Sequence, residues 1–248
     1  LSGCVTCAGV APIARLSTGM QPIENSMVVI GVLSGIVAAL YAVFERDDGR
    51  ALGWSSVSQL GFAILSPTYA CVYAMQHGIC KTLLFSTLTN PKTNDDNSQS
   101  QNNISDWILV ATFIIASLSI VGLPYTAGFI TKTWLKGDIP MEARLIASTA
   151  SLMTATVYAR LIWNRIKNSK LTMKTLTPKW ISVFDLFRPK SLILATSSLL
   201  LIADGRSYLK AYYPANIRDS LIAVVLGSFL YTSVAGLQTE KFVKPVTR

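Results

Sequence analysis

The chain has 248 residues, of which 51% are hydrophobic and only 14% are charged. Soluble domains usually contain about 25% charged residues, so this composition excludes an ordinary soluble globular domain and indicates a membrane protein. A net charge of +9 would favour nucleic acid as a partner of a soluble chain, but here the cations follow the loops between apolar segments, so we expect no nucleic-acid partner.

Apolar runs long enough to cross a bilayer follow one another along the chain. A helix needs about 20 apolar residues to span the hydrocarbon core. The runs are continuous and lack the alternation of a β-barrel, so we predict an all-α, polytopic bundle of about eight transmembrane helices. The predicted spans are an incomplete one at 1–17, then 27–45, 51–66, 69–89, 107–135, 144–164, 190–206 and 220–237.

The first run starts at residue 1 without the charged segment or cleavage site of a signal peptide, so we expect further residues to precede it. It holds Cys4 and Cys7, and the other two cysteines are Cys71 and Cys80. A single CxxC pair without a second pair or nearby histidines is weak evidence for zinc or for a disulfide. We therefore expect small, buried, unpaired thiols and no metal site.

Basic residues divide unequally between alternate loops of the predicted bundle. One set of loops carries 14 lysines and arginines, and the opposite set carries 6. The positive-inside rule places the first set on the cytoplasmic or stromal side of a bacterial inner membrane, a thylakoid or an organellar equivalent. Its basic segment is expected to lie at an anionic lipid surface. The loops of this set are 46–50, a polar solvated loop at 91–106, 160–190 and 240–248.

The span 69–89 carries two ionisable side chains near its middle, His77 and Lys81. Their i, i+4 spacing puts them on one helix face, about 6 Å apart along the axis. A charge at this depth costs on the order of 3 kcal/mol, and no acid in the span offsets that cost. Because burial favours neutral lysine and neutral histidine can pass a proton between its nitrogens, the pair has the chemistry of a proton relay. The alternative is a hydrogen-bonded core histidine and a lysine that reaches the membrane interface.

The fifth predicted span is too long for a single membrane crossing and contains the sequence VGLPYTAGF at 121–129. Pro124 lacks a backbone donor, and Gly122 and Gly128 loosen the same region, so we predict a broken helix. The unpaired backbone groups of such a break need protein or an internal cavity as partners. Lys132 follows two helical turns after the proline, which favours a functional break over a packing kink.

Three stretches in this order resemble a known family: ERDDGRALGWSSVSQLGF, QHGICKTLLF and SLSIVGLPYTAGFITK. The family comprises the antiporter-like membrane subunits of NADH:quinone and NAD(P)H:quinone oxidoreductases (complex I and NDH-1) and the related Mrp sodium/proton antiporter subunits. The resemblance covers roughly residues 1–165, which look like the second of the family's two inverted repeats. Residues 166–248 are predicted to hold a basic loop and C-terminal transmembrane helices, so the chain resembles only the family's C-terminal half.

The resemblance implies a hydrated proton path through this repeat. His77 and Lys81 would belong to its central relay, and Lys132 would be the terminal residue that exchanges protons with one side of the membrane. A further implication is that Arg50, Ser55 and Ser58 support the start of the helix beside the relay.

The resemblance also implies that redox chemistry belongs to partner subunits. The sequence has no haem ligand pair, iron–sulfur cysteine set or dinucleotide-binding GxGxxG, so we expect no cofactor in this chain. Its expected partners are lipid and other membrane subunits of a multi-subunit complex, and its expected substrate is a proton or cation. Many family members carry a lysine where this chain has Cys7. Two alternatives stay open, an Mrp-type cation/proton antiporter component and a structural subunit that does not conduct.

Overall fold

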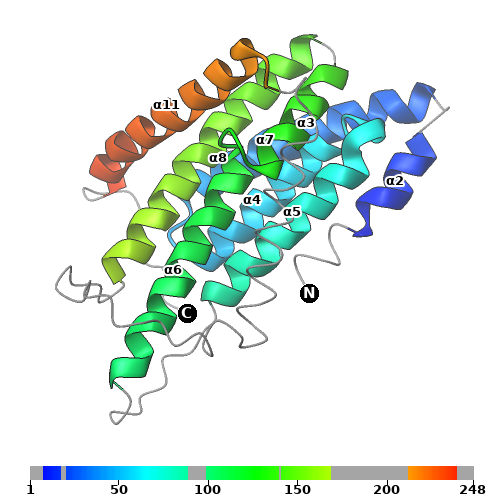
Figure 1. Cartoon of the computed structure of the whole chain (residues 1–248). Coiled ribbons are helices and arrows are strands. Elements are labelled where there is room, and N and C mark those ends of the chain that lie inside the picture. Colours follow the sequence, from blue (N-terminus) through cyan, green and yellow to red (C-terminus); the bar gives the residue numbers. More distant parts are fainter. Residues whose placement is uncertain (1–7, 18–20, 89–98, 140, 169–211, 239–248) are drawn as a thin grey trace, which may run out of the picture.

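The computed structural model describes residues 8–17, 21–88, 99–139, 141–168 and 212–238. The described residues form α-helices, with Tyr212 in a 3₁₀-helical conformation and no strand among them, which confirms the predicted fold class (Figure 1). The helices are α2 (Val10–Ser17), α3 (Gln21–Phe44), α4 (Asp48–Ala63), α5 (Pro67–Leu88), α6 (Gln99–Val121), α7 (Ala127–Asp138), α8 (Met141–Asn168) and α11 (Pro214–Gln238).

The helices pack side by side, and α11 and α2 lie at opposite edges of the group (Figure 1). In the interior, α5 contacts α4, α6 and α7, while α8 contacts α3, α4 and α6. The outer helix α11 packs on α8, and α2 packs on α5 and α3. Four of the predicted site residues on α4 and α5 are buried in this interior, namely Ser55, Ser58, His77 and Lys81.

Small residues bring α3 and α4 into close contact. A Cβ atom added to Gly31 would collide with the carbonyl oxygen of Gly61, so only glycine permits this approach. Close approach through small residues is the usual way in which helices associate in a membrane. The hydroxyl of Ser58 adds a hydrogen bond of 2.8 Å to the carbonyl of Gly35. The predicted supporting residue Ser58 thus joins α4 to α3.

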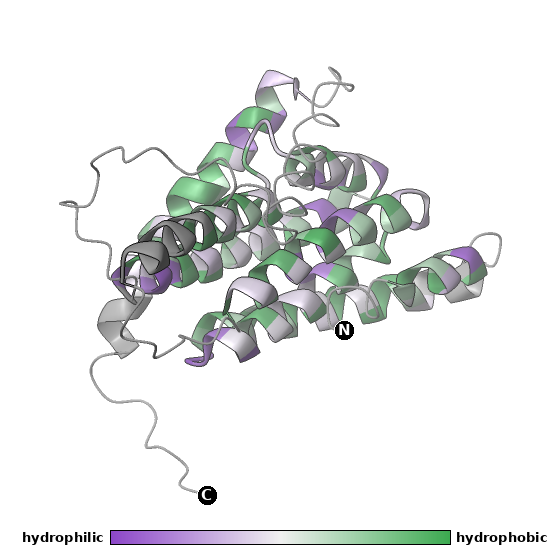
Figure 2. Cartoon of the chain, turned by 60° about the horizontal axis from the view of Figure 1, so that its bottom comes forward, coloured by the Kyte–Doolittle hydropathy of each residue, from purple (hydrophilic) through white to green (hydrophobic). Residues whose placement is uncertain are grey.

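The outer surface of the bundle is strongly apolar. Figure 2 shows apolar residues along most of the length of the helices. Two described segments are long and apolar enough to cross a membrane, Ser26–Phe44 in α3 and Ala143–Lys167 in α8, and Leu109–Val121 is a shorter apolar segment. The predicted number of about eight spans stays a prediction. Large apolar side chains exposed on α3 are Val29, Ile30, Leu33, Val37, Leu40, Tyr41 and Phe44.

Two predicted loops are shorter than expected. Residues 99–106 belong to α6, so the second half of the predicted loop 91–106 is helical. This polar stretch, QSQNNISD, contains no glycine or proline to stop a helix. Residues 160–168 likewise continue α8, which runs through the predicted boundary between residues 165 and 166.

Some predicted elements lie outside the described residues, and the prediction about the cysteines is correct only in part. The predicted span 190–206, the loop 240–248 and the cysteines Cys4 and Cys7 lie outside the described residues. The prediction that the thiols are buried is correct for Cys80 but wrong for Cys71, which is exposed. Cys71 lies on α5, away from the helices that cover the opposite face, because a helix only partly covered by neighbours keeps an outward face.

Arg160 on α8 holds the end of α3. The residue is only 7% exposed, and its guanidinium donates to the carbonyls of Val43 at 2.8 Å and Ala42 at 3.3 Å. The last carbonyls of a helix have no partner within the helix, so a cation from a neighbouring helix satisfies them.

Replacing Arg160 with methionine should lower the free energy of unfolding by about 1–3 kcal/mol, because two buried carbonyls lose their donors. Thermal unfolding in detergent measures this change. Lys167→Met, an exposed position on the same helix, is the matched control and should leave the midpoint unchanged. Equal unfolding midpoints for the two variants would show that Arg160 does not stabilise the end of α3.

Candidate functional site

Lys81 points into the interior of the bundle. The residue is only 1% exposed, and its Nζ donates to the carbonyl of Leu52 on α4 at 2.7 Å. The same Nζ lies 5.6 Å from the ring centroid of Tyr158 on α8, a distance at which a cation is attracted to an aromatic face. The geometry does not fit a lysine that reaches the membrane interface.

His77 lies one turn earlier on α5 and is also 1% exposed. Its ring stacks on that of Tyr73, with centroids 6.0 Å apart and planes 13° from parallel. Within the described part of the chain, its Nε2 is buried without a hydrogen-bond partner. The Nε2 atom therefore has no hydrogen-bond partner on another helix among the described residues.

Hydrogen bonds continue from Tyr73 across the bundle. The Tyr73 hydroxyl donates to Oε1 of Gln59 on α4. Nε2 of Gln59 donates to the hydroxyl of Thr154 on α8 at 2.6 Å. A separate hydrogen bond of 3.3 Å joins the hydroxyls of Ser55 on α4 and Tyr158 on α8. Polar side chains thus line the interior between the three helices.

The predicted break separates α6 from α7. Gly122 follows the last residue of α6 with a φ of 89°, a left-handed conformation that glycine adopts without strain. The carbonyl of Val121 accepts a hydrogen bond from Lys132 Nζ at 3.1 Å, and the carbonyl of Gly122 accepts one from the hydroxyl of Ser220 on α11. Both carbonyls of the break therefore have protein partners, as a non-helical segment at membrane depth requires.

The other residues of the break fix the start of α7. Pro124 lies in the turn between the helices, and Tyr125 beside it has a φ of 71°. Gly128, in the first turn of α7, packs so closely on the end of α6 that an added Cβ would overlap the carbonyl oxygen of Ser119. The hydroxyl of Ser119 accepts a hydrogen bond of 3.2 Å from Gln76 on α5. These contacts hold together the break, α6 and α5, the helix that carries His77 and Lys81.

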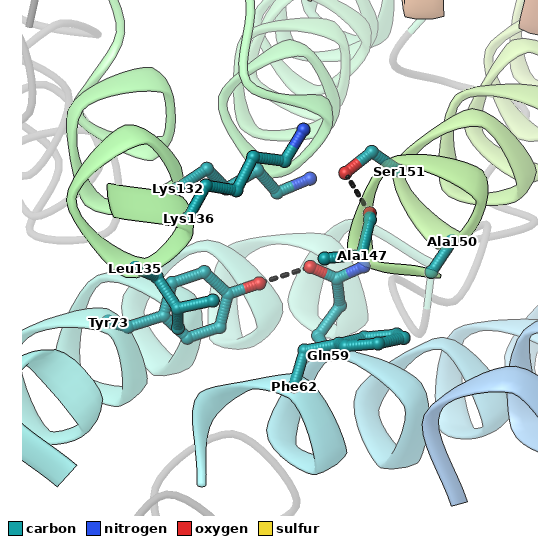
Figure 3. Close-up of a pocket in the computed structure, with 9 residues that line it drawn as sticks. All are labelled: Gln59, Phe62, Tyr73, Lys132, Leu135, Lys136, Ala147, Ala150 and Ser151. Atoms are coloured by element: carbon teal, nitrogen blue, oxygen red, sulfur yellow. Dashed lines mark hydrogen bonds between the residues drawn. The ribbon is translucent and has the colours of Figure 1, made fainter. Parts of the chain in front are cut away.

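A small cavity separates Tyr73 and Gln59 from Lys132 (Figure 3). Its volume of about 20 Å³ is enough for one water molecule. Figure 3 shows the amines of Lys132 and Lys136 on the side of this cavity where Ser151 lies. One water there would connect the polar interior to the lysines of α7.

A second cavity, of about 320 Å³, is lined by the end of α6, the break, α7, α8 and α11. Lys132 and Lys136 line both cavities, and Lys132 is partly buried. We call the cavity of about 20 Å³ the inner cavity and the cavity of about 320 Å³ the outer cavity. Lys132 therefore stands between the interior of the bundle and its outside.

Two of the three residues predicted to support the relay, Ser55 and Ser58, are buried on α4. Ser55 is bonded to Tyr158, the ring beside Lys81. Ser58 joins α4 to α3. Arg50 lies at the start of α4 with a side chain 72% exposed, paired with Glu45 at 3.5 Å, and so takes no part in the buried polar contacts that the structure describes around the relay.

Sequence reasoning missed Tyr73, Gln59, Lys136 and Asp219. Tyr73 could have been found, because its i, i+4 spacing from His77 places it on the same helix face. Nothing in the sequence pattern indicates that Gln59 or Asp219 reaches this region. In the part of the chain that the structure describes, no three His, Cys, Asp or Glu side chains are grouped as a metal site.

Comparison with known proteins defines the family. Residues 1–161 match the family described as "NADH:quinone oxidoreductase/Mrp antiporter, TM". The chain belongs to this family. It is an antiporter-like integral membrane protein, as the three sequence stretches predict.

Individual relatives agree with this assignment. The chain is 26% identical over 200 residues to NADH-quinone oxidoreductase subunit N of Buchnera aphidicola, an alignment that covers 71% of this chain and 40% of that protein. It is 31% identical over 175 residues to NAD(P)H-quinone oxidoreductase subunit 5 of Acorus calamus, covering 60% and 23%. It is 27% identical over 138 residues to NADH-ubiquinone oxidoreductase chain 5 of Marchantia polymorpha, covering 50% and 21%. The chain thus aligns with less than half the length of each of these relatives.

Proposed function

We propose that this chain conducts protons as an antiporter-like membrane subunit of an NADH- or NAD(P)H-quinone oxidoreductase. The observation that carries the proposal is the set of basic groups in the interior, His77, Lys81 and Lys132, with a cavity on each side of the last. Ionisable side chains in the interior of a membrane bundle are costly and mark ion or proton pathways.

The proposed path begins at Lys81. A proton on its amine passes to Nε2 or Nδ1 of His77, one helical turn away, and the ring releases a proton from its other nitrogen. Tyr73 and a water of the inner cavity carry it on to Lys132. Because like charges repel strongly in a medium of low dielectric constant, a proton that arrives at His77 favours release of the proton held by Lys132. Arrival of a proton at His77 and release of a proton from Lys132 are therefore coupled.

The family and the names of the relatives support membership of a multi-subunit complex. Under this proposal, quinone and NAD(P)H chemistry belongs to the partner subunits, with lipid around the bundle. Residues 1–165 form the second repeat of the channel, and 166–248 supply a basic loop and terminal helices. The more basic loops face the cytoplasm or stroma, and the outer cavity faces the opposite side.

The family description also includes Mrp antiporters, so an Mrp-type antiporter component is the second candidate. Affinity purification from native membranes distinguishes the two. Recovery of hydrophilic iron–sulfur subunits supports the quinone oxidoreductase, whereas recovery of membrane subunits alone supports the antiporter.

The test of conduction is Lys132→Met, which keeps the length of the side chain but removes its titratable group. We expect proton translocation by the assembled complex in proteoliposomes to fall about a hundredfold, since a positioned acid–base group typically contributes that much or more. Lys167→Met, the same substitution at an exposed position near the end of α8, is the control and should leave the rate unchanged. A wild-type rate in Lys132→Met would leave only the structural alternative.

A further inference from the structure

The outer cavity is completed by α11, a helix beyond the residues 1–161 that match the family. The end of α7, the start of α8 and the start of α11 meet around it. Ser220 of α11 also donates its hydroxyl to the carbonyl of Gly122 in the break. This contact fixes α11 directly beside Lys132, whose amine bonds the preceding carbonyl.

The charged residues that line the outer cavity are basic, apart from one. Lys132, Lys136 and Arg144 line it, and Asp219 is the one acid among its described lining residues. The guanidinium of Arg144 is occupied by carbonyls, with 3.0 Å hydrogen bonds to Ile139 and to Gly137. These bonds tie the start of α8 to the end of α7.

Asp219 lies where the outer cavity meets the outside. Its side chain is 60% exposed and pairs with Arg218 at 3.2 Å. On the other side it lines the outer cavity together with Lys132 and Lys136. Asp219 is therefore a carboxylate in contact with solvent and, through the cavity, with the lysines of α7.

We propose that Asp219 is the group through which Lys132 exchanges protons with the aqueous phase. This inference rests on the proposed function and adds the acid that the proposed path otherwise lacks. The cavity volume of about 320 Å³ holds several water molecules, so lysine and carboxylate need no direct contact.

The step conserves protons and charge. The ammonium of Lys132 gives a proton to a cavity water as that water gives one of its own to the Asp219 carboxylate. This leaves a neutral amine, a water and a neutral carboxylic acid. Asp219 then releases the proton to solvent and becomes a carboxylate again, while Lys132 regains a proton from the relay.

The test is Asp219→Asn in the assembled complex, with proton flux measured in proteoliposomes. We expect the flux to fall about tenfold, less than for a buried relay group because water partly replaces an exposed one. Asp219→Glu should keep the flux near the wild-type rate, and formate added on the outer-cavity side should restore flux in Asp219→Asn. Asp47→Asn is the matched control, since asparagine is as good a helix N-cap as aspartate and Asp47 caps α4 at the opposite end of the bundle.

The outcomes separate the two proposals. If Lys132→Met loses flux but Asp219→Asn keeps the wild-type rate, the outlet role is wrong and the proposed function stands. If Asp219→Asn and Asp219→Glu are equally slow and formate restores neither, Asp219 is only structural. If Lys132→Met itself conducts normally, both proposals are wrong.

Discussion

Replacing Lys81 with methionine should abolish proton translocation and leave the folded protein as stable as before, or more stable. The flux ends because the central relay loses its titratable amine. Stability is kept because burying a charge costs desolvation free energy, and an apolar side chain of similar size does not carry that cost. The carbonyl of Leu52 retains a donor, the hydroxyl of Ser56 at 3.0 Å.

Two measurements on the same preparation check this prediction, proton flux in proteoliposomes and thermal unfolding in detergent. Thr82→Val, the next position on α5, is exposed and serves as the control for both. The prediction is contradicted by a variant that unfolds at a lower temperature yet still conducts, since Lys81 would then be a structural residue held by Leu52 and Tyr158.

Replacing Gly128 with alanine should destabilise the protein by about 3 kcal/mol or more, because the new Cβ would overlap the carbonyl of Ser119. A backbone oxygen cannot move aside as a flexible side chain can. For a chain of this size the unfolding midpoint should drop by roughly 10 °C. The flux per folded molecule should fall as well, since separating α6 from α7 displaces Lys132 from Val121.

Gly137 offers a matched control on the same helix. A Cβ added there would meet nothing within 4 Å. Gly137→Ala should therefore be neutral or stabilise the protein by about 0.5–1 kcal/mol, because alanine is the better helix former. If the two alanine variants melt at the same temperature, the close approach at Gly128 is not required.

Much of the architecture could be predicted from the apolar runs. Their continuity indicated helices, and their spacing placed most of the described ones within a few residues. The boundary errors have one cause. Residues 99–106 and 160–168 are too polar for a membrane span but still suitable for a helix, and hydropathy alone does not show where a helix continues into water.

Parts of the site could be predicted too, because they depend on local geometry. Helical periodicity places His77 and Lys81 on one face, whatever surrounds them. Proline and glycine at 122–128 limit the backbone at that point, so the break is a property of the segment itself. The position of Lys132 after the break follows from both.

The relations between helices were decided by the tertiary structure alone. Lys81 meets Leu52, Gln59 meets Thr154, and Ser220 meets Gly122, and each pair joins segments far apart in the chain. By itself, the sequence determined that the interior of a helical membrane protein contains bases, and where one helix breaks. Packing determined that Lys132 lies between two cavities and that Asp219 borders the outer one, because the distance between two helices depends on every side chain between them.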